Sequence, residues 1–111
     1  MSRVAPGEVE LAASFRRHLG GRFEAAGLRV QFHYNQPPGI HFKVAPPTEF
    51  REAIIKGLSE GLALRFPDFR ATASIWVLDV IVDSVDSSPR AFYCVSRMVI
   101  DQAYSLAESA F

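Results

Sequence analysis

The sequence predicts a two-layer α/β sandwich of the α+β class, in which two helices cover one face of a single sheet in the order β-β-β-α-β-α. Three observations favour this class. Polar and apolar residues alternate along the first third of the chain, which is the pattern of half-buried strands. Two later segments repeat apolar residues every three or four positions, as helices do. Between them lies a run rich in β-branched and aromatic residues, which is typical of a strand with neighbours on both sides.

The composition is that of one globular domain. The chain has 111 residues, of which 49% are hydrophobic and 22% charged. We expect a loose tail over residues 1–7 and a single domain over residues 8–111. Twelve basic and twelve acidic residues give a formal charge of zero, which excludes binding to nucleic acid or anionic membranes by bulk charge alone. No apolar run approaches the roughly 18 residues of a membrane span and no secretory signal is visible, so we expect a cytoplasmic protein with no membrane partner.

The first segment of the domain fits both the strand period and the helix period. Gly20 and Gly21 decide between them, because two glycines inside a helix would cost about 2 kcal/mol relative to alanine. In a turn between strands the same residues supply the positive φ that the turn needs. We therefore expect a strand over residues 8–18, followed by a glycine turn that continues through residues 22–27.

Two further strands, over residues 28–34 and 40–44, flank a turn rich in proline and glycine. They are predicted to pair as an antiparallel hairpin in which Phe32 faces Phe42. In that register every apolar residue falls on one face of the sheet and every polar residue on the other. A long strand over residues 70–82 completes the sheet.

The two helices are predicted over residues 48–64 and 87–108, because apolar residues recur along each at helical spacing and proline stands at each start, where it is tolerated. The second helix is also expected to have a serine cap. A stripe of small residues, Ala53, Gly57 and Gly61, predicts a close approach of the first helix to the sheet. The inner face of the second helix is expected to hold Phe92, Val95, Val99 and Leu106. The residues expected in the core are Phe32, Phe42, Ile54, Leu58, Trp76, Phe92, Val95 and Val99.

One run of residues, Val85-Asp86-Ser87-Ser88-Pro89-Arg90-Ala91-Phe92, carries a family resemblance. It resembles the VDSS-x-x-AF run that opens the last helix of domain IV of bacterial elongation factor G. The similarity continues backwards through the helix over residues 49–60, Phe66-Pro67 and the segment Phe15-Arg16 to Gly20-Gly21-Arg22. It covers approximately residues 14–107, which is nearly the whole chain.

The resemblance implies a fold and a role. Domain IV is a two-layer sandwich with a left-handed βαβ crossover, and it is the arm that reaches into the ribosomal decoding site during translocation. It does not hydrolyse GTP, and this sequence has no G-x-x-x-x-G-K-[ST] loop to bind phosphates. We therefore expect an elongation factor G domain IV-like protein without a GTPase domain, with no enzymatic activity, no nucleotide and no cofactor.

The tip of the domain departs from the family pattern. Val80 stands where the family has a glycine, and Asp83 stands where it has a histidine. The segment over residues 79–86 therefore carries three aspartates and no basic residue, and it would repel phosphates. Replacing Asp83 with histidine is expected to strengthen RNA binding.

If RNA binds, we expect contact through the arginines and the glycine turn rather than through the aspartates. Arginines release counterions from phosphates, and glycines let backbone N–H groups approach them. The helix start at the two serines is an anion site in principle, with Asp86 competing for it as a cap. The predicted RNA-binding residues are Arg16, Gly20, Gly21, Arg22, Ser87 and Ser88.

The histidines and the cysteine have a simpler interpretation than a reactive site. His33 and His41 face each other in the predicted hairpin, but only His18 is available as a third ligand, and zinc needs three or four. A solvated polar sheet face accounts better for them, so we expect no metal. Cys94 has no histidine near it in sequence and is expected to pack as a small side chain.

Two functions remain open. The leading hypothesis is a non-catalytic, translation-related protein that binds the ribosome or RNA. The alternative is a homo-oligomeric or partner-binding module that keeps the scaffold without RNA contact. Val80, Ile81 and Val82 favour this alternative, because alternation places apolar groups on both faces of the strand beyond the helices. A third hypothesis is a small-ligand site on the polar face of the sheet.

Overall fold

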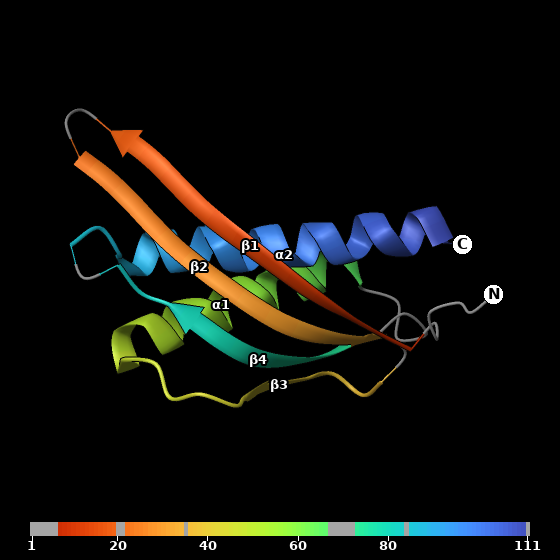
Figure 1. Ribbon diagram of the computed structural model, residues 1–111. Helices are drawn as coiled ribbons and strands as arrows, with labels where there is room; N and C mark the ends of the chain where they lie inside the picture. Colours follow the sequence, from red (N-terminus) through yellow and green to blue (C-terminus); the bar gives the residue numbers. More distant parts are fainter. Residues whose placement is uncertain (1–6, 20–21, 35, 67–72, 84, 111) are drawn as a thin grey trace.

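A computed structural model describes residues 7–19, 22–34, 36–66, 73–83 and 85–110, except for the side chains of residues 19, 22 and 108–110 (Figure 1). The elements are β1 (Glu8–Leu19), β2 (Arg22–Tyr34), β3 (Gly39–Phe42), α1 (Thr48–Arg65), β4 (Ala73–Ile81) and α2 (Pro89–Ala110). The predicted order β-β-β-α-β-α is confirmed. The expected tail lies outside the described residues except for Gly7. Within the described residues, neither helix combines the length and the apolar character needed to cross a bilayer.

The four strands form one sheet in the order β1-β2-β4-β3. β2 is antiparallel to both of its neighbours, and β3 is parallel to β4. Both helices lie behind this sheet in Figure 1, which confirms the two-layer sandwich. In the same view β3 and β4 run to the left, β4 lies above β3, and α1 returns behind them, so the β3-α1-β4 crossover is left-handed.

The predicted hairpin between the second and third strands is wrong. β4 lies between β2 and β3, so Phe32 is aligned with Ile75, which in turn is aligned with Ile40. The reason is that β4 is the most apolar strand, and an inner position buries it between two neighbours. The assignment of faces survives this change, since Phe32 is buried and Phe42 packs against the same core.

The segment over residues 22–27 is part of β2 and not part of a turn. Arg22 pairs with Leu19, and the pairing with β1 continues without a break to His33 opposite Glu8. Gly27 is needed in this strand by its neighbour in β4, because a Cβ there would lie 2.9 Å from the Cβ of Ile81. The two glycines of the predicted turn lie outside the described residues.

A β-bulge shifts the register between β2 and β4 at Arg29 and Val30. Leu78 is the extra residue that it inserts, because Arg29 pairs with Asp79 and Val30 pairs with Val77. Without the extra residue, each side chain of β4 after Val77 would lie on the opposite face of the sheet from the one that it now occupies. With it, Val80 still packs against the core, and Ile81 is directed to the open face of the sheet.

The core confirms six of the eight predicted residues, each with no exposed surface: Phe32, Ile54, Leu58, Phe92, Val95 and Val99. Phe42 is half-buried against this core. Trp76 is an error of the prediction. It alternates with the buried Ile75 and Val77, so it lies on the open face, where its ring stacks on His41 with 4.3 Å between centroids.

The inner face of α2 differs from the predicted one at its C-terminal end. Leu106 is 45% exposed, whereas Ile100 and Ala103 are fully buried. The cause is that α2 packs against α1 as well as against the sheet, which buries a wider stripe than the predicted one.

The small residues of α1 approach α2 and not the sheet, contrary to the prediction. A Cβ on Gly57 would lie 2.7 Å from the carbonyl oxygen of Tyr93 and 2.8 Å from the Cβ of Ser96. A Cβ on Gly61 would lie 2.9 Å from the Cβ of Ile100. The large residues of α1 fill the core beneath the sheet, so its glycine stripe is left to face the neighbouring helix.

Phe92→Ala tests the core. Phe92 is fully buried, and its ring lies 4.7 Å from that of Phe50 between centroids. The substitution leaves a cavity and is expected to lower the free energy of unfolding by about 3–5 kcal/mol. Denaturant unfolding measures this loss, with the half-exposed Leu106→Ala as the matched control. A Phe92→Ala protein as stable as the control would contradict this position of α2.

Gly57→Ala tests the contact between the helices by the sign of its effect. Helix propensity alone predicts a gain of about 1 kcal/mol. The contacts with Tyr93 and Ser96 predict a net loss of about 1–3 kcal/mol instead, because the added methyl group overpacks the interface. Thermal unfolding distinguishes the two, with the exposed Ser59→Ala in the same helix as control. A variant more stable than the wild type would mean that the helices are farther apart.

Candidate functional site

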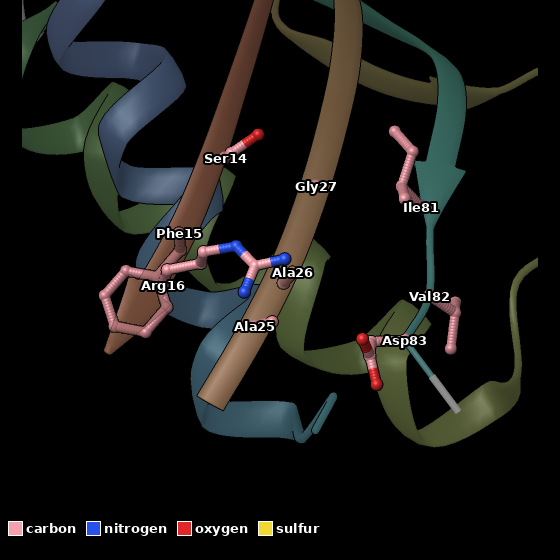
Figure 2. Close-up of a pocket in the computed structure, with 9 residues that line it drawn as sticks. All are labelled: Ser14, Phe15, Arg16, Ala25, Ala26, Gly27, Ile81, Val82 and Asp83. Carbon is pink, nitrogen blue, oxygen red and sulfur yellow. The ribbon is translucent and has the colours of Figure 1, made fainter. Parts of the chain in front are cut away.

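At one end of the molecule β1 and β2 project beyond the helices (Figure 1). Residues at this end line a groove. Its volume is about 200 Å³, and Figure 2 shows its lining from the open side of the sheet. The residues that line it are Ser14, Phe15, Arg16, Ala25, Ala26, Gly27, Ile81, Val82 and Asp83. Three strands and the loop after β4 therefore contribute to one site.

The strand register creates the groove. Ala25 and Gly27 of β2 form its floor, and their small size leaves space between the taller side chains of the two neighbouring strands. Arg16 rises from β1 on one side, and its guanidinium extends over β2 in the direction of Asp83 in Figure 2. The groove thus has a cationic wall and an anionic wall that face each other.

Asp83 organises the loop between β4 and α2. Its Oδ1 accepts hydrogen bonds from the backbone N–H groups of Val85 at 2.9 Å and Asp86 at 2.8 Å. The hydrogen bond from Asp86 and then that from Val85 hold the pKa of Asp83 below its ordinary value, and the charge of Arg16 adds a smaller lowering. The Asp83 carboxylate therefore stabilises the loop through these hydrogen bonds and also lines the groove.

Ser87 fastens this loop to β2. Its Oγ donates a hydrogen bond to the carbonyl oxygen of Ala25 at 2.7 Å and accepts one from the N–H of Asp83 at 2.8 Å. The N–H of Ala25 in turn donates to the carbonyl oxygen of Asp86 at 3.0 Å. Nothing in the sequence could reveal this connection, because Ser87 and Ala25 are 62 residues apart.

Ser88 caps α2. Its Oγ accepts a hydrogen bond from the N–H of Ala91 at 3.1 Å, and Pro89 is the first helical residue. The predicted serine cap is therefore confirmed, and the residue that holds the first turn is Ser88. Both serine hydroxyls thus make hydrogen bonds within the protein, and their contact with RNA stays a prediction.

Of the other predicted RNA-binding residues, only Arg16 has a described side chain. Arg16 lines the groove. Arg22 begins β2, but its side chain lies outside the described part, as do Gly20 and Gly21. The predicted separation of the arginines from the aspartates is wrong for Arg16 and Asp83, because the order β1-β2-β4 brings them to the same groove.

Exposed apolar side chains gather around the same end. Ile81 is 53% exposed, Val82 is 42% exposed and Val85 is 84% exposed. The expectation of apolar groups beyond the helices is confirmed for Ile81 and Val82, whereas Val80 packs against the core. Val85 was missed, although it belongs to the motif that carries the family resemblance.

The histidines do not meet. His33 lies 3.5 Å from the Glu8 carboxylate through Nδ1 and 3.2 Å from Gln31 Oε1 through Nε2. His41 stacks on a tryptophan of β4, the strand that separates it from β2, so the predicted pairing of the two histidines is wrong. Among the residues that the structure describes, no three histidine, cysteine or acidic residues are arranged to hold a metal ion.

Comparison with known proteins places the fold. No family model matches the sequence, and no curated protein is similar to it. A crystal structure of a protein from Thermus thermophilus is similar to this chain, with a TM-score of 0.78 and 18% sequence identity. The fold is a known one. The similarity covers 91% of this chain but only 16% of the Thermus protein, and at this identity it shows the fold alone.

Asp83→Asn tests the role of the carboxylate in the loop. Asparagine keeps the Oδ1 acceptor and removes the charge. Because folding lowers the pKa of Asp83, the ionised carboxylate stabilises the folded protein above its ordinary pKa, and this contribution is lost as the pH falls through the folded-state pKa. The wild type should therefore be more stable than the variant at neutral pH, and the difference should shrink in acid.

Denaturant unfolding at a series of pH values measures this difference. The control is Ser59→Ala, which changes no ionisable group and should give a difference that does not vary with pH. A constant difference between the wild type and Asp83→Asn would contradict the hydrogen bonds assigned to the carboxylate.

Proposed function

We propose that the protein is a non-catalytic domain similar to domain IV of elongation factor G, and that it binds RNA on the ribosome with the end that carries the groove. The observation that carries the proposal is that Arg16 and residues 81–83 line one groove, and that Ser87 is hydrogen-bonded to Ala25 at its floor. Residues 85–88 begin the run that resembles the family, and Arg16 is the predicted phosphate contact that lines the groove.

The charges around the groove support this proposal. Arg16 is exposed on the open face of the sheet, where a phosphate can approach it. The charge of Asp83 is partly satisfied by two backbone N–H groups and by Arg16 itself. Its repulsion of a phosphate is therefore weaker than that of a carboxylate without partners.

The structural roles of the motif residues support the similarity to domain IV. Ser87 fastens the loop to β2, Ser88 caps α2, and Phe92 fills the core. These are requirements of the connection between β4 and α2 in this fold. They support the likeness in structure, whereas RNA binding rests on Arg16 and its surroundings.

Combined replacement of Arg16 and Arg22 with alanine tests RNA binding. The expected result is weaker co-sedimentation with ribosomes and a shallower dependence of the binding constant on salt. The slope of log K against log salt should fall by about 0.7–0.9 for each phosphate contact that is lost. The matched control removes two positive charges from the helical layer, through Arg65→Ala and Arg97→Ala.

Asp83→Asn is the complementary variant in this assay. It removes a negative charge from the groove and keeps the acceptor for the loop, so binding should become stronger. Histidine is a poorer test than asparagine, because it also removes the oxygen that holds Val85 and Asp86. If the wild type binds and the double arginine variant binds equally well with the same salt slope, the RNA surface lies elsewhere. If the wild type does not bind at any salt concentration, the RNA proposal is wrong.

A second candidate function is a partner-binding module that uses the apolar side chains of the same end. Ile81 and Val85 favour it, since large exposed apolar groups that gather in one place mark interfaces. Such a complex would be insensitive to salt and would be weakened by Val85→Ser. Binding to RNA would be sensitive to salt and would depend on Arg16, so substitutions at these two positions separate the two functions.

A further inference from the structure

The first strand leaves one long edge of the sheet open. β1 has 12 residues and pairs with β2 on one side only, and within the described residues no strand covers its other side. Natural edge strands are protected by short length, charged side chains, proline or bulges, and of these β1 has only the charged side chains. β1 contains no proline, and its pairing with β2 has no bulge. Its free N–H and C=O groups can therefore pair with a further strand.

The charges along β1 are ordered from acidic to basic. The side chains on the open face of this strand are, in order, Glu8, Glu10, Ala12, Ser14, Arg16 and His18. The acidic residues occupy one end, the basic residues the other, and two uncharged residues separate them. Such a strand is complementary to an antiparallel copy of itself, because opposite charges then face each other across the pair.

We propose that a second copy of this chain pairs with β1 in antiparallel orientation about a two-fold axis at Ala13, so that the two sheets become one. In this register Glu10 comes opposite the partner's Arg16, and Glu8 opposite the partner's His18. In the single chain Glu10 pairs with Arg29 at 2.9 Å and Arg16 extends over β2, so both side chains would turn outward to meet the partner. The two-fold axis repeats each contact, which gives two Glu10–Arg16 ion pairs and two Glu8–His18 contacts on the open face. On the helical face Leu11 comes opposite the partner's Phe15.

Neighbouring registers are less complementary. A shift that moves the axis to Ala12 or to Ser14 leaves only one kind of charged pair, Glu8 with the partner's Arg16 or Glu10 with the partner's His18. A shift by a single residue in the pairing would place the open face of one copy beside the helical face of the other. The charge order of β1 therefore specifies the register about Ala13.

The helical layer supplies a second observation at the same edge. A shallow apolar hollow of about 470 Å³ lies between β1 and α2, and it includes Leu11 and the half-exposed Leu106. Leu11 lies two residues from the proposed axis, so the hollow of each copy borders the new pair of strands. Pairing of the strands would then cover Leu106 in each copy, which removes apolar surface from water.

Charge reversal tests this dimer on the full chain, with mass measured by light scattering over a range of protein concentrations. The wild type should have twice the mass of one chain. Glu10→Arg and Arg16→Glu should each shift it to the mass of one chain, and the combination of both should restore the dimer. Glu52→Arg, on the exposed surface of α1, is the control and should remain dimeric. A wild type that is monomeric throughout, or a combined variant that stays monomeric, would overturn the proposal.

Disulfide trapping tests the register itself, in chains that also carry Cys94→Ser. In the proposed register Ala12 faces the partner's Ser14. A mixture of Ala12→Cys and Ser14→Cys chains should therefore form a cross-linked dimer, and neither variant alone should do so. Cross-linking of Ser14→Cys alone would overturn the register in favour of an axis at Ser14. These measurements contain no RNA, so they stand apart from the proposed ribosome binding.

Discussion

The burial of β4 is the constraint on which the rest of the structure depends. This strand carries the densest run of β-branched and aromatic residues, and only an inner position between two other strands removes it from water on both edges. Its position separates β2 from β3 and makes β3 parallel to it, which in turn requires α1 as a crossover. The bulge at Leu78 then keeps the side chains of its last residues on the correct faces, and Ile81 reaches the groove as a result.

Sequence periodicity predicted the faces of the strands and the identity of the elements, because side-chain direction follows from alternation alone. It could not predict partners. Phe32 and Phe42 were assigned to the correct face in a hairpin that does not exist, since pairing depends on the burial of a third strand far along the chain. Trp76 was assigned to the core from its hydrophobicity, although its parity directs it to the open face. The stripe of small residues on α1 was correctly predicted to make a close approach. The prediction placed the sheet opposite this stripe, whereas the structure places α2 there.

The candidate site was predictable only in part for the same reason. Arg16 was found from a local cluster of charge, which is visible in one segment of sequence. Its proximity to Asp83 depends on three strands being adjacent, and the hydrogen bond from Ser87 to Ala25 joins segments that have no pattern in common. The motif that resembles elongation factor G therefore indicates how the last helix is attached, while the groove beside it arises from small residues in β2 that carry no sequence signal.

The hydrogen bonds around Ser87 also have a consequence for the thermodynamics of recognition. The described residues of the connection between β4 and α2, which are residues 82–83 and 85–88, are held from within by Asp83 and from the side by Ala25. A loop with these internal constraints has already lost much of its conformational entropy during folding, so a ligand does not have to order it on arrival. Contacts made with this end would be reflected more fully in affinity than contacts made with a free segment of the same composition. The side chains of the groove act as a preorganised surface, and selectivity there depends on shape and charge rather than on induced fit.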